Sequence, residues 1–371
     1  MASPLLDVEA AIVDNKGGPF RLKTVSVESP GPDEVLVRIV ATGICQTDAH
    51  SRNQEYPVPL PVILGHEGAG IVESVGSAVR DVVPGDHVAL TFPSCGRCRS
   101  CRAGAPANCE HGFTLAFGAA RLDGSNAYAA SGVHGHFFGQ SSFARFALAA
   151  ERNTVKIADD MPLTLAGPLG CGLQTGAGAV LNSLQVNAGE SVAVFGTGAV
   201  GLAAVMAAQV AGATTIVAVD VNDARLRLAA ELGATHTVNG RTEKLTDRLR
   251  QIRAGGFDYV LEITAIPDML ALAVEQLSPM GVAALIGGAP AGTKAPIDMN
   301  SLLNGGRKLR GIAQGDSMPQ LFIPKLADLY RSGRFPFDRL VRQYDFADIN
   351  QAFADTARGD VIKPILVMGD E

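Results

Sequence analysis

The sequence predicts an α/β protein in which a mainly β domain holds an inserted domain built on a parallel, doubly wound sheet. The chain has 371 residues, too many for one ordinary hydrophobic core, so two domains are expected. Its first third consists of short β-branched runs between Pro and Gly turns, whereas its middle alternates strand-like with helix-like segments. After about residue 311 the pattern becomes irregular again, as if the first domain resumed.

The first domain is expected to span residues 1–172 and to be completed by residues 314–371. Turn signals such as Pro84-Gly-Asp separate short apolar runs that are typical of antiparallel strands. The expected strands are Glu9–Val13, Glu34–Ala41, Gly70–Val75, His87–Phe92 and, near the end of the chain, Pro364–Met368.

The inserted domain is expected to span residues 173–313. Strands alternate with helices there at the spacing of a parallel sheet. The expected strands are Ser191–Phe195, Thr214–Val219, Phe257–Thr264 and Gly281–Gly287. The expected helices are Ala199–Ala211, Asp223–Leu232 with Asn222 as its cap, Glu243–Arg253 and Asp268–Leu277.

Composition and charge exclude several classes of partner. With 47% hydrophobic and 18% charged residues the chain is typical of a globular protein, and its net charge of -6 argues against nucleic acid as a partner. The uncharged stretch Ser191–Val219 is interrupted by glycines, which favours a buried sheet over a membrane span. Because Met1–Phe20 lacks the pattern of a secretory signal, a cytoplasmic protein is expected.

A glycine-rich segment predicts a dinucleotide site. Gly196-Thr-Gly-Ala-Val-Gly201 fits G-x-G-x-x-G, follows a predicted strand and opens a predicted helix, whose N-terminus favours a pyrophosphate. The predicted cofactor-binding residues in this segment are Gly196, Gly198, Val200 and Gly201. Asp220 ends the next strand, where a carboxylate accepts hydrogen bonds from ribose hydroxyls and repels a 2′-phosphate, so NAD is predicted. The nearby Arg225 leaves NADP open as an alternative.

Four of the six cysteines are spaced as ligands of one metal ion. Cys95, Cys98, Cys101 and Cys109 follow the pattern C-x2-C-x2-C-x7-C. Four thiolates close a tetrahedron and leave no open position, which is typical of a structural zinc site. An iron–sulfur cluster is the alternative, but its motif continues with a shorter gap and Cys-Pro, whereas Glu110 follows here.

The other two cysteines, Cys45 and Cys171, are candidates for a second metal site. His66 lies in Gly65-His-Glu-Gly-Ala-Gly70, where the glycines permit a tight backbone path. Two cysteines and one histidine form a three-ligand zinc site with a free fourth position.

These motifs together resemble the zinc-containing medium-chain alcohol dehydrogenases. The matching segments are Gly43-Ile-Cys45-Gln-Thr-Asp48, Gly65–Gly70, Pro84-Gly-Asp86, the four-cysteine loop, Gly170-Cys171-Gly172 and Gly196–Gly201. The resemblance covers nearly the whole chain. It implies a GroES-like catalytic domain, a Rossmann domain, an active site in the cleft between them and a homodimer or homotetramer.

The resemblance also implies a role for each residue of the motifs. Cys45, His66 and Cys171 hold a catalytic zinc, with Glu67 as an occasional extra ligand. Thr47 and His50 form a proton relay that leads away from the substrate oxygen, and Asp48 orients the zinc-bound histidine. Gln46 stands where many relatives have an arginine on the cofactor pyrophosphate, and Lys363 matches the second basic contact.

Within the family the chain looks most like the bacterial aryl-alcohol (benzyl alcohol) dehydrogenases, some close relatives of which oxidise geraniol. Four phenylalanines lie in or beside segments that line the family's substrate channel: Phe92, Phe117, Phe137 and Phe138. They favour reversible oxidation of a primary aromatic or allylic alcohol to its aldehyde, with core packing as the alternative reading of each ring. The rival enzymes are a geraniol dehydrogenase, a glutathione-linked formaldehyde dehydrogenase and a zinc-free quinone reductase. An NAD-binding scaffold or crystallin-like protein is the non-enzymatic alternative.

Overall fold

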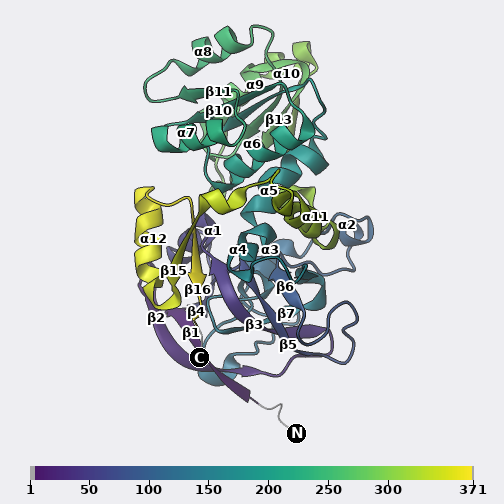
Figure 1. Cartoon of the computed structure of the whole chain (residues 1–371), viewed down its shortest axis with the longest axis vertical. Coiled ribbons are helices and arrows are strands. Elements are labelled where there is room, and N and C mark those ends of the chain that lie inside the picture. The colour runs from purple at the N-terminus through teal and green to yellow at the C-terminus, as the bar shows by residue number, and fades with distance from the viewer. Residues whose placement is uncertain (1–4, 370–371) are drawn as a thin grey trace. The chain divides into compact units, whose positions relative to one another are not determined.

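The computed structural model describes residues 5–369 and divides into two compact units (Figure 1). One unit comprises the chain up to Gly172, residues 318–331 and the chain from Phe337, and the other comprises residues 173–317 and 332–336. We propose that these units are the two domains that the sequence predicts. Residues 1–4, part of the segment searched for a secretory signal, lie outside the described residues.

The first unit is mainly β, with two sheets whose strands are mostly antiparallel. One sheet has the order β2-β1-β4, and the other has the order β15-β16-β3-β5-β6-β8, with β7 also paired to β3. Only β15 and β16 run parallel among the strand pairs of these two sheets. The strands are β1 (Leu5–Val13), β2 (Phe20–Glu28), β3 (Glu34–Gly43), β4 (Val62–Ile63), β5 (Gly68–Val75), β6 (His87–Leu90), β7 (Phe146–Ala150), β8 (Thr154–Lys156), β15 (Val341–Asp345) and β16 (Lys363–Val367).

Helices lie between these strands, and one of them, α1, carries the predicted relay residues Thr47 and His50. They are α1 (Gln46–Arg52), α2 (Arg99–Arg102), α3 (Gly112–Phe117), α4 (Leu163–Ala166), α11 (Pro319–Arg331) and α12 (Ile349–Arg358). The core between the sheets contains fully buried side chains of β1, β3 and β6, among them Ile12, Val37 and Leu90. This core fixes the ends of β3 and β5, where the first metal-binding group lies.

The second unit has six parallel strands in the order β11-β10-β9-β12-β13-β14, the doubly wound sheet that the sequence predicts. The strands are β9 (Ser191–Phe195), β10 (Thr215–Asp220), β11 (His236–Asn239), β12 (Phe257–Glu262), β13 (Leu277–Leu285) and β14 (Lys308–Gly311). The helices are α5 (Gly172–Gly178), α6 (Ala199–Ala211), α7 (Asp223–Glu231), α8 (Leu245–Ile252), α9 (Pro267–Glu275) and α10 (Met299–Gly305). Helix α6 packs on β9 and β10, and α9 packs on β12 and β13.

The helix that follows the glycine-rich segment shows why this part of the sequence was predictable. Helix α6 begins after Gly198 and ends at Gly212, which adopts the left-handed conformation (φ 84°) that terminates helices. Its alanines favour a helix and allow close packing on the sheet. The next helix, α7, is capped by the side chain of Asn222, which accepts hydrogen bonds from the backbone N–H groups of Ala224 and Arg225.

Among the described residues, no helix combines the length and apolar character that crossing a membrane would require.

Candidate active site

Three loops of the first unit converge on the first group of potential metal ligands. Cys45 precedes α1 at the end of β3, His66 and Glu67 precede β5, and Cys171 precedes α5. Their ligand atoms all lie within 4.8 Å of one another. His66, Glu67 and Cys171 are buried. The structure therefore brings together the residues that the sequence assigns to the catalytic zinc.

Glycines make this convergence possible because the backbones approach too closely for any side chain. A Cβ on Gly43 would lie 2.1 Å from a carboxylate oxygen of Glu67, and one on Gly167 would lie 2.1 Å from the Glu67 carbonyl oxygen. Gly65, immediately before His66, has φ +90°, a conformation that favours glycine.

The donor set fits a zinc ion. His66 donates from Nδ1 to Asp48 Oδ1 over 2.9 Å, so its other nitrogen, Nε2, faces the thiols. Among the described residues that buried Nε2 has no oxygen or nitrogen partner, which a metal ion would provide. The pKa of Cys45 lies well below its ordinary value, chiefly because a hydrogen bond from Cys171 stabilises the thiolate. A buried thiolate and a histidine with a fixed tautomer are typical zinc ligands.

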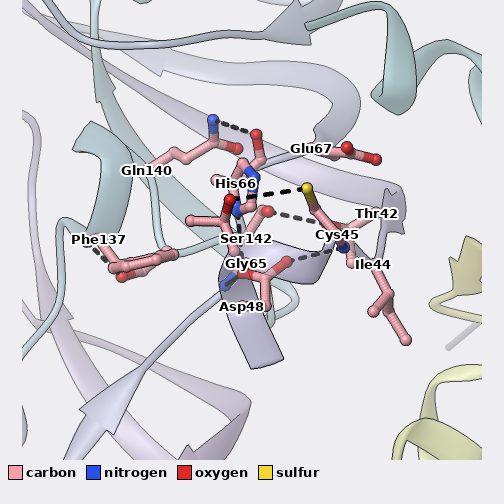
Figure 2. Close-up of polar contacts among 12 residues, drawn as sticks. Thr42, Ile44, Cys45, Asp48, Gly65, His66, Glu67, Phe137, Gln140 and Ser142 are labelled. Carbon is pink, nitrogen blue, oxygen red and sulfur yellow. Dashed lines mark hydrogen bonds and ion pairs between the residues drawn. The ribbon is translucent and has the colours of Figure 1, made fainter. Parts of the chain in front are cut away.

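Asp48 is completely buried and stabilises three parts of the site. Its carboxylate accepts hydrogen bonds from His66, from the backbone N–H of Gly65 at 3.1 Å and from the backbone N–H of Cys45 at 3.0 Å. It thus lies where the sequence places an orienting carboxylate, and it also ties the two ligand loops together (Figure 2).

Gln140 is a site residue that the sequence reasoning missed. Its side chain is fully buried and donates to the carbonyl oxygen of His66 at 3.0 Å (Figure 2). It also donates to the Thr91 carbonyl oxygen and accepts a hydrogen bond from the backbone N–H of Gly68 at 3.0 Å. It therefore fixes the backbone on both sides of Glu67. Because 72 residues separate Gln140 from Gly68, no local motif indicates this contact.

Lys363 lies beneath the metal-binding group and forms an ion pair with Glu67. Its ammonium contacts the two carboxylate oxygens of Glu67 at 2.8 and 2.9 Å and donates to the Ile44 carbonyl oxygen at 3.0 Å. Burial alone would lower the pKa of Lys363, but the charges of Glu67, Cys45 and Cys171 raise it above its ordinary value. The sequence predicts a pyrophosphate contact for Lys363, whereas here its ammonium is occupied by Glu67.

The predicted relay residues lie on α1. The Thr47 hydroxyl is 3.9 Å from the Cys45 sulfur, beside the metal-binding group. His50 lies one turn further along the helix, with its side chain 30% exposed, and its Nδ1 contacts a carboxylate oxygen of Glu55. Gln46, at the first position of α1, is exposed.

Two of the four predicted phenylalanines pack against His66, and a third packs against those two. The Phe138 ring stacks on His66 with centroids 4.5 Å apart, and the edge of Phe137 meets the same histidine ring at 5.8 Å. Phe117 extends this aromatic shell by packing against Phe137 and Phe138. Phe92 instead lines a separate cavity of about 310 Å³ together with Cys101.

The four-cysteine group forms a second cluster, with its sulfur atoms within 4.8 Å of one another. Backbone N–H groups point at the sulfurs: that of Cys98 donates to Cys95, that of Cys101 to Cys98 and that of Cys95 to Cys109, at 3.3–3.4 Å. Such bonds from Cys101 and Glu110 lower the pKa of Cys98 to about 6. These bonds stabilise thiolates, so the cluster fits the closed structural zinc site that the spacing predicts.

The glycine-rich segment of the second unit has the expected form of a dinucleotide site. Gly196 has φ +94°, and a Cβ on Gly201 would lie 1.9 Å from the Gly196 carbonyl oxygen, so both positions require glycine. Gly198 precedes α6, whose first turn contains Val200.

Asp220 lies at the end of β10, where the sequence places it. Its carboxylate accepts hydrogen bonds from the backbone N–H and the hydroxyl of Thr197, both at 2.7 Å, and from the N–H groups of Val221 and Asn222. Arg225 follows in the first turn of α7. Its side chain is half-buried, and its buried Nε has no hydrogen-bond partner among the described residues.

Comparison with known proteins was made for the whole chain. Residues 31–159 match the family "Alcohol dehydrogenase GroES-like domain", and residues 199–330 match "Zinc-binding dehydrogenase". The chain is 44% identical to geraniol dehydrogenase of Castellaniella defragrans over 98% of both chains.

Two solved structures have nearly the same fold as this chain. An alcohol dehydrogenase zinc-binding domain protein from Burkholderia ambifaria is 52% identical with a TM-score of 0.96, and the match covers 99% of this chain and 100% of that one. Benzyl alcohol dehydrogenase from Acinetobacter calcoaceticus is 46% identical with a TM-score of 0.96, and the match covers 98% and 100%.

Proposed function

This chain belongs to the zinc-binding medium-chain alcohol dehydrogenases, and from that premise we propose that it oxidises a primary aromatic or allylic alcohol to its aldehyde with NAD. The reaction moves a hydride from the alcohol carbon to the nicotinamide and releases the hydroxyl proton. Both the reaction class and its zinc dependence follow from the family, whereas the substrate and the coenzyme are the proposal.

The proposed catalytic zinc would be held by Cys45, His66 and Cys171, and the structural zinc by Cys95, Cys98, Cys101 and Cys109. When bound at an open site, zinc supplies a Lewis acid that makes an alcohol hydroxyl acidic near neutral pH. Asp48 accepts a hydrogen bond from Nδ1–H of His66 and so keeps the lone pair of Nε2 free for the metal. Gln140 holds the His66 backbone, so that the ring does not have to reorganise when a ligand binds.

The chain's own hydroxyl and imidazole groups would move the proton. Thr47 lies close enough to the zinc-binding thiol for its hydroxyl to meet a substrate oxygen, and His50 would accept the proton further along α1. The charge of Glu67 is balanced by Lys363, so Glu67 would remain a carboxylate that is available to the metal.

NAD is the proposed coenzyme because β10, the strand that follows the glycine-rich segment and α6, ends at the carboxylate of Asp220 and not at a basic group. Gly196, Gly198 and Gly201 leave room for a pyrophosphate at the start of α6, and Asp220 disfavours a 2′-phosphate. Arg225, close to Asp220 in the sequence, keeps NADP as the alternative. The family further suggests a homodimer or homotetramer.

One observation carries the substrate proposal: the aromatic shell that packs directly on a zinc ligand. Phe138 and Phe137 both contact the His66 ring, and Phe117 packs behind them. Aromatic and unsaturated substrates gain from such surfaces, because edge-to-face and stacked ring pairs add to the burial of apolar area. A sugar or a charged thiol adduct would find no matching polar groups in this shell.

The test is the formation of NADH from NAD with benzyl alcohol, geraniol and ethanol, before and after chelation by phenanthroline. We expect kcat/KM to be highest for benzyl alcohol or geraniol, and turnover to cease on chelation and return with zinc. A preference for ethanol, or turnover that survives removal of all zinc, would contradict the proposal. The same assay with NADP tests the choice of coenzyme.

Geraniol is the second candidate substrate, favoured by the 44% identity to a geraniol dehydrogenase. In both benzyl alcohol and geraniol, the carbon that bears the primary hydroxyl is bonded to an unsaturated carbon. Both alcohols are therefore compatible with the same aromatic shell. The ratio of their kcat/KM values decides between them.

A further inference from the structure

The turn that follows α1 folds back onto the helix and brings Glu55 against His50. The backbone N–H of Gln54 donates to the Ser51 carbonyl oxygen at 3.0 Å, and Gln54 has φ +58°, which reverses the chain. The N–H groups of Glu55 and Tyr56 then both donate to the carbonyl oxygen of His50, at 2.9 and 3.4 Å. The backbone of Glu55 is therefore fixed relative to His50 before any side-chain contact is considered.

The His50 ring is held on two sides. Its Nδ1 contacts a carboxylate oxygen of Glu55, and the Tyr56 ring packs against it with centroids 5.3 Å apart. Tyr56 in turn packs on Phe117 of the aromatic shell, at 5.5 Å. The orientation of the imidazole is thus coupled to the aromatic surface proposed for the substrate.

A carboxylate only accepts hydrogen bonds, so the proton of a neutral His50 ring must lie on Nδ1 and its lone pair on Nε2. We infer that Glu55 is a positioning residue for the proton relay: it holds His50 in the tautomer that accepts a proton at Nε2. This inference rests on the proposed function, in which His50 is the base that receives the proton. It also gives the base a negative neighbour that stabilises the imidazolium formed when the proton arrives.

The charges around the pair support this role. The pKa of Glu55 lies below its ordinary value, chiefly because of the hydrogen bond from His50 and further because of the charge of Lys16. Glu55 is therefore ionised over the pH range in which the enzyme would work. Tyr56 also packs against His50, and burial raises the pKa of its hydroxyl, so Tyr56 stays neutral.

The opposing interpretation is an ordinary surface ion pair. The side chains of His50 and Glu55 are 30% and 48% exposed, and exposed pairs often contribute nothing measurable to stability. The two interpretations predict different effects of Glu55 substitutions on the tautomer of His50 and on the rate of turnover. The experiment therefore measures the tautomer and the rate on the zinc-loaded full chain.

The variants are Glu55→Gln, which keeps an acceptor but removes the charge, and Glu55→Ala, which removes both. Glu73→Gln is the matched control, because Glu73 is a comparably exposed carboxylate, 51%, in a weak ion pair with Arg38. The tautomer of His50 is measured by long-range proton–nitrogen correlation on protein labelled with ¹⁵N in histidine. The resonance is assigned by its loss in His50→Gln.

We expect the parent and Glu55→Gln to carry the neutral His50 proton on Nδ1, and Glu55→Ala to shift towards the Nε2–H form. In both variants kcat/KM should fall, because the negative charge that stabilises the imidazolium is lost. The Ala variant should lose roughly tenfold in kcat, a fraction of the hundredfold or more that general acid–base catalysis contributes. Glu73→Gln should match the parent in all three measurements.

An Nε2–H tautomer in the parent, or Glu55 variants with parental kcat/KM and kcat, would overturn the inference. His50→Gln separates this failure from that of the proposed function. If His50→Gln is slow and the Glu55 variants are not, only the role of Glu55 is wrong. If His50→Gln turns over like the parent, His50 is no relay, and the proposed relay and the inference are both overturned.

Discussion

Among single residues, Gln140 shows how a buried polar side chain can determine a metal site that it does not touch. It makes three hydrogen bonds to the backbone around His66, Gly68 and Thr91. Each partner is itself buried, so it has no water to replace the lost bond. The geometry of the ligand loop therefore depends on a residue from a different part of the chain.

We predict that Gln140→Leu releases zinc more readily than the parent. The substitution keeps the volume but removes the hydrogen bonds of Gln140 to the backbone of Gly68 and His66, and a buried polar group that loses its partner costs about 1–3 kcal/mol. The expected result is a lower Tm and faster loss of zinc to a chelator, measured by metal analysis after timed dialysis. Gln343→Leu, at an exposed position of β15, is the control. Zinc retention equal to that of this control would contradict the prediction.

The ion pair between Lys363 and Glu67 leads to a second prediction. Lys363→Met leaves the buried Glu67 carboxylate without its counter-charge, a change that costs roughly 3–5 kcal/mol in other proteins. We expect a clear loss in the free energy of unfolding, partly restored in Lys363→Met/Glu67→Gln, where the remaining side chain is neutral. Lys308→Met, on the exposed strand β14, is the matched control.

The result also decides the role that the resemblance implies for Lys363. If its ammonium binds the cofactor pyrophosphate, Lys363→Met weakens NADH binding while stability stays near that of the parent. We expect Lys363→Met to lose stability more than it loses NADH affinity, because the ammonium is enclosed by Glu67 and the Ile44 carbonyl oxygen.

At the level of elements, the segment 112–135 is the part whose role the sequence indicated least. The structure shows side-chain contacts that connect it to the rest of the first unit. Arg121 forms a bidentate ion pair with Glu34 at the start of β3, with 2.6 and 3.0 Å between the atoms. His136 directly follows the segment, adopts φ +61° and accepts a hydrogen bond from the backbone N–H of Ala127 on its Nε2. The segment contains the helix α3, which carries Phe117 of the aromatic shell.

His136 should make stability depend on pH. Burial lowers its pKa to about 4, while an unfolded histidine titrates near pH 6.5. Between these values the unfolded chain binds a proton that the folded chain does not, so stability is full above about pH 6.5 and falls as pH falls towards 4. The total loss is on the order of 3 kcal/mol.

We predict that His136→Asn, which tolerates the same backbone conformation, loses stability less steeply between pH 7 and pH 5 than the parent. The measurement is the free energy of unfolding at several pH values, compared as a difference between the two proteins, so that zinc-site protonation common to both cancels. His236→Gln, at an exposed histidine, should keep the parental slope. Parallel curves for parent and His136→Asn would show that His136 is not the titrating group.

The elements that were predicted correctly are those whose boundaries carry their own signals. The strand Ser191–Phe195 and the helix Ala199–Ala211 occur with the predicted bounds, because the chain turns at Gly196 and stops at Gly212. Strands in both units were missed, and in the second unit these are β11 and β14. Both are short, and β14 is polar and exposed, so neither shows the apolar run of a buried strand. Helix α11 was missed because Pro324 lies inside it, and a proline normally argues against a helix.

The site was predictable to the extent that its residues lie in contiguous motifs. Cys45, Asp48 and His66 stand in such motifs, whereas Gln140 and Glu55 act through contacts that depend on the fold. Glu55 is only five residues from His50, yet its role depends on the reversal at Gln54, whose positive φ no sequence pattern indicated.

For the whole molecule, the two cysteine-rich groups predict two zinc ions that differ in accessibility and in purpose. The group around His66 is mostly buried, whereas three of the four ligands in the Cys95 group are partly exposed. The first group leaves a position for substrate, and the second has four thiols that close the coordination shell. Each ion should therefore be removable on its own, with a different consequence.

We predict that Cys98→Ser binds one zinc per chain in place of two, unfolds at a lower temperature and still binds NADH. The loop 95–109 is tied together by N–H···S bonds and one short helix, so without its ion little remains to order it.

Cys45→Ser should also hold one zinc but keep a Tm near that of the parent while losing turnover, because the core around β3 and β5 stays packed without the metal. Metal analysis, thermal unfolding and NADH fluorescence titration of the two variants measure these three properties. Equal losses of Tm in both would mean that the ion near His66 stabilises the fold as much as the four-cysteine ion does, and that the division into a catalytic and a structural zinc is wrong for this chain.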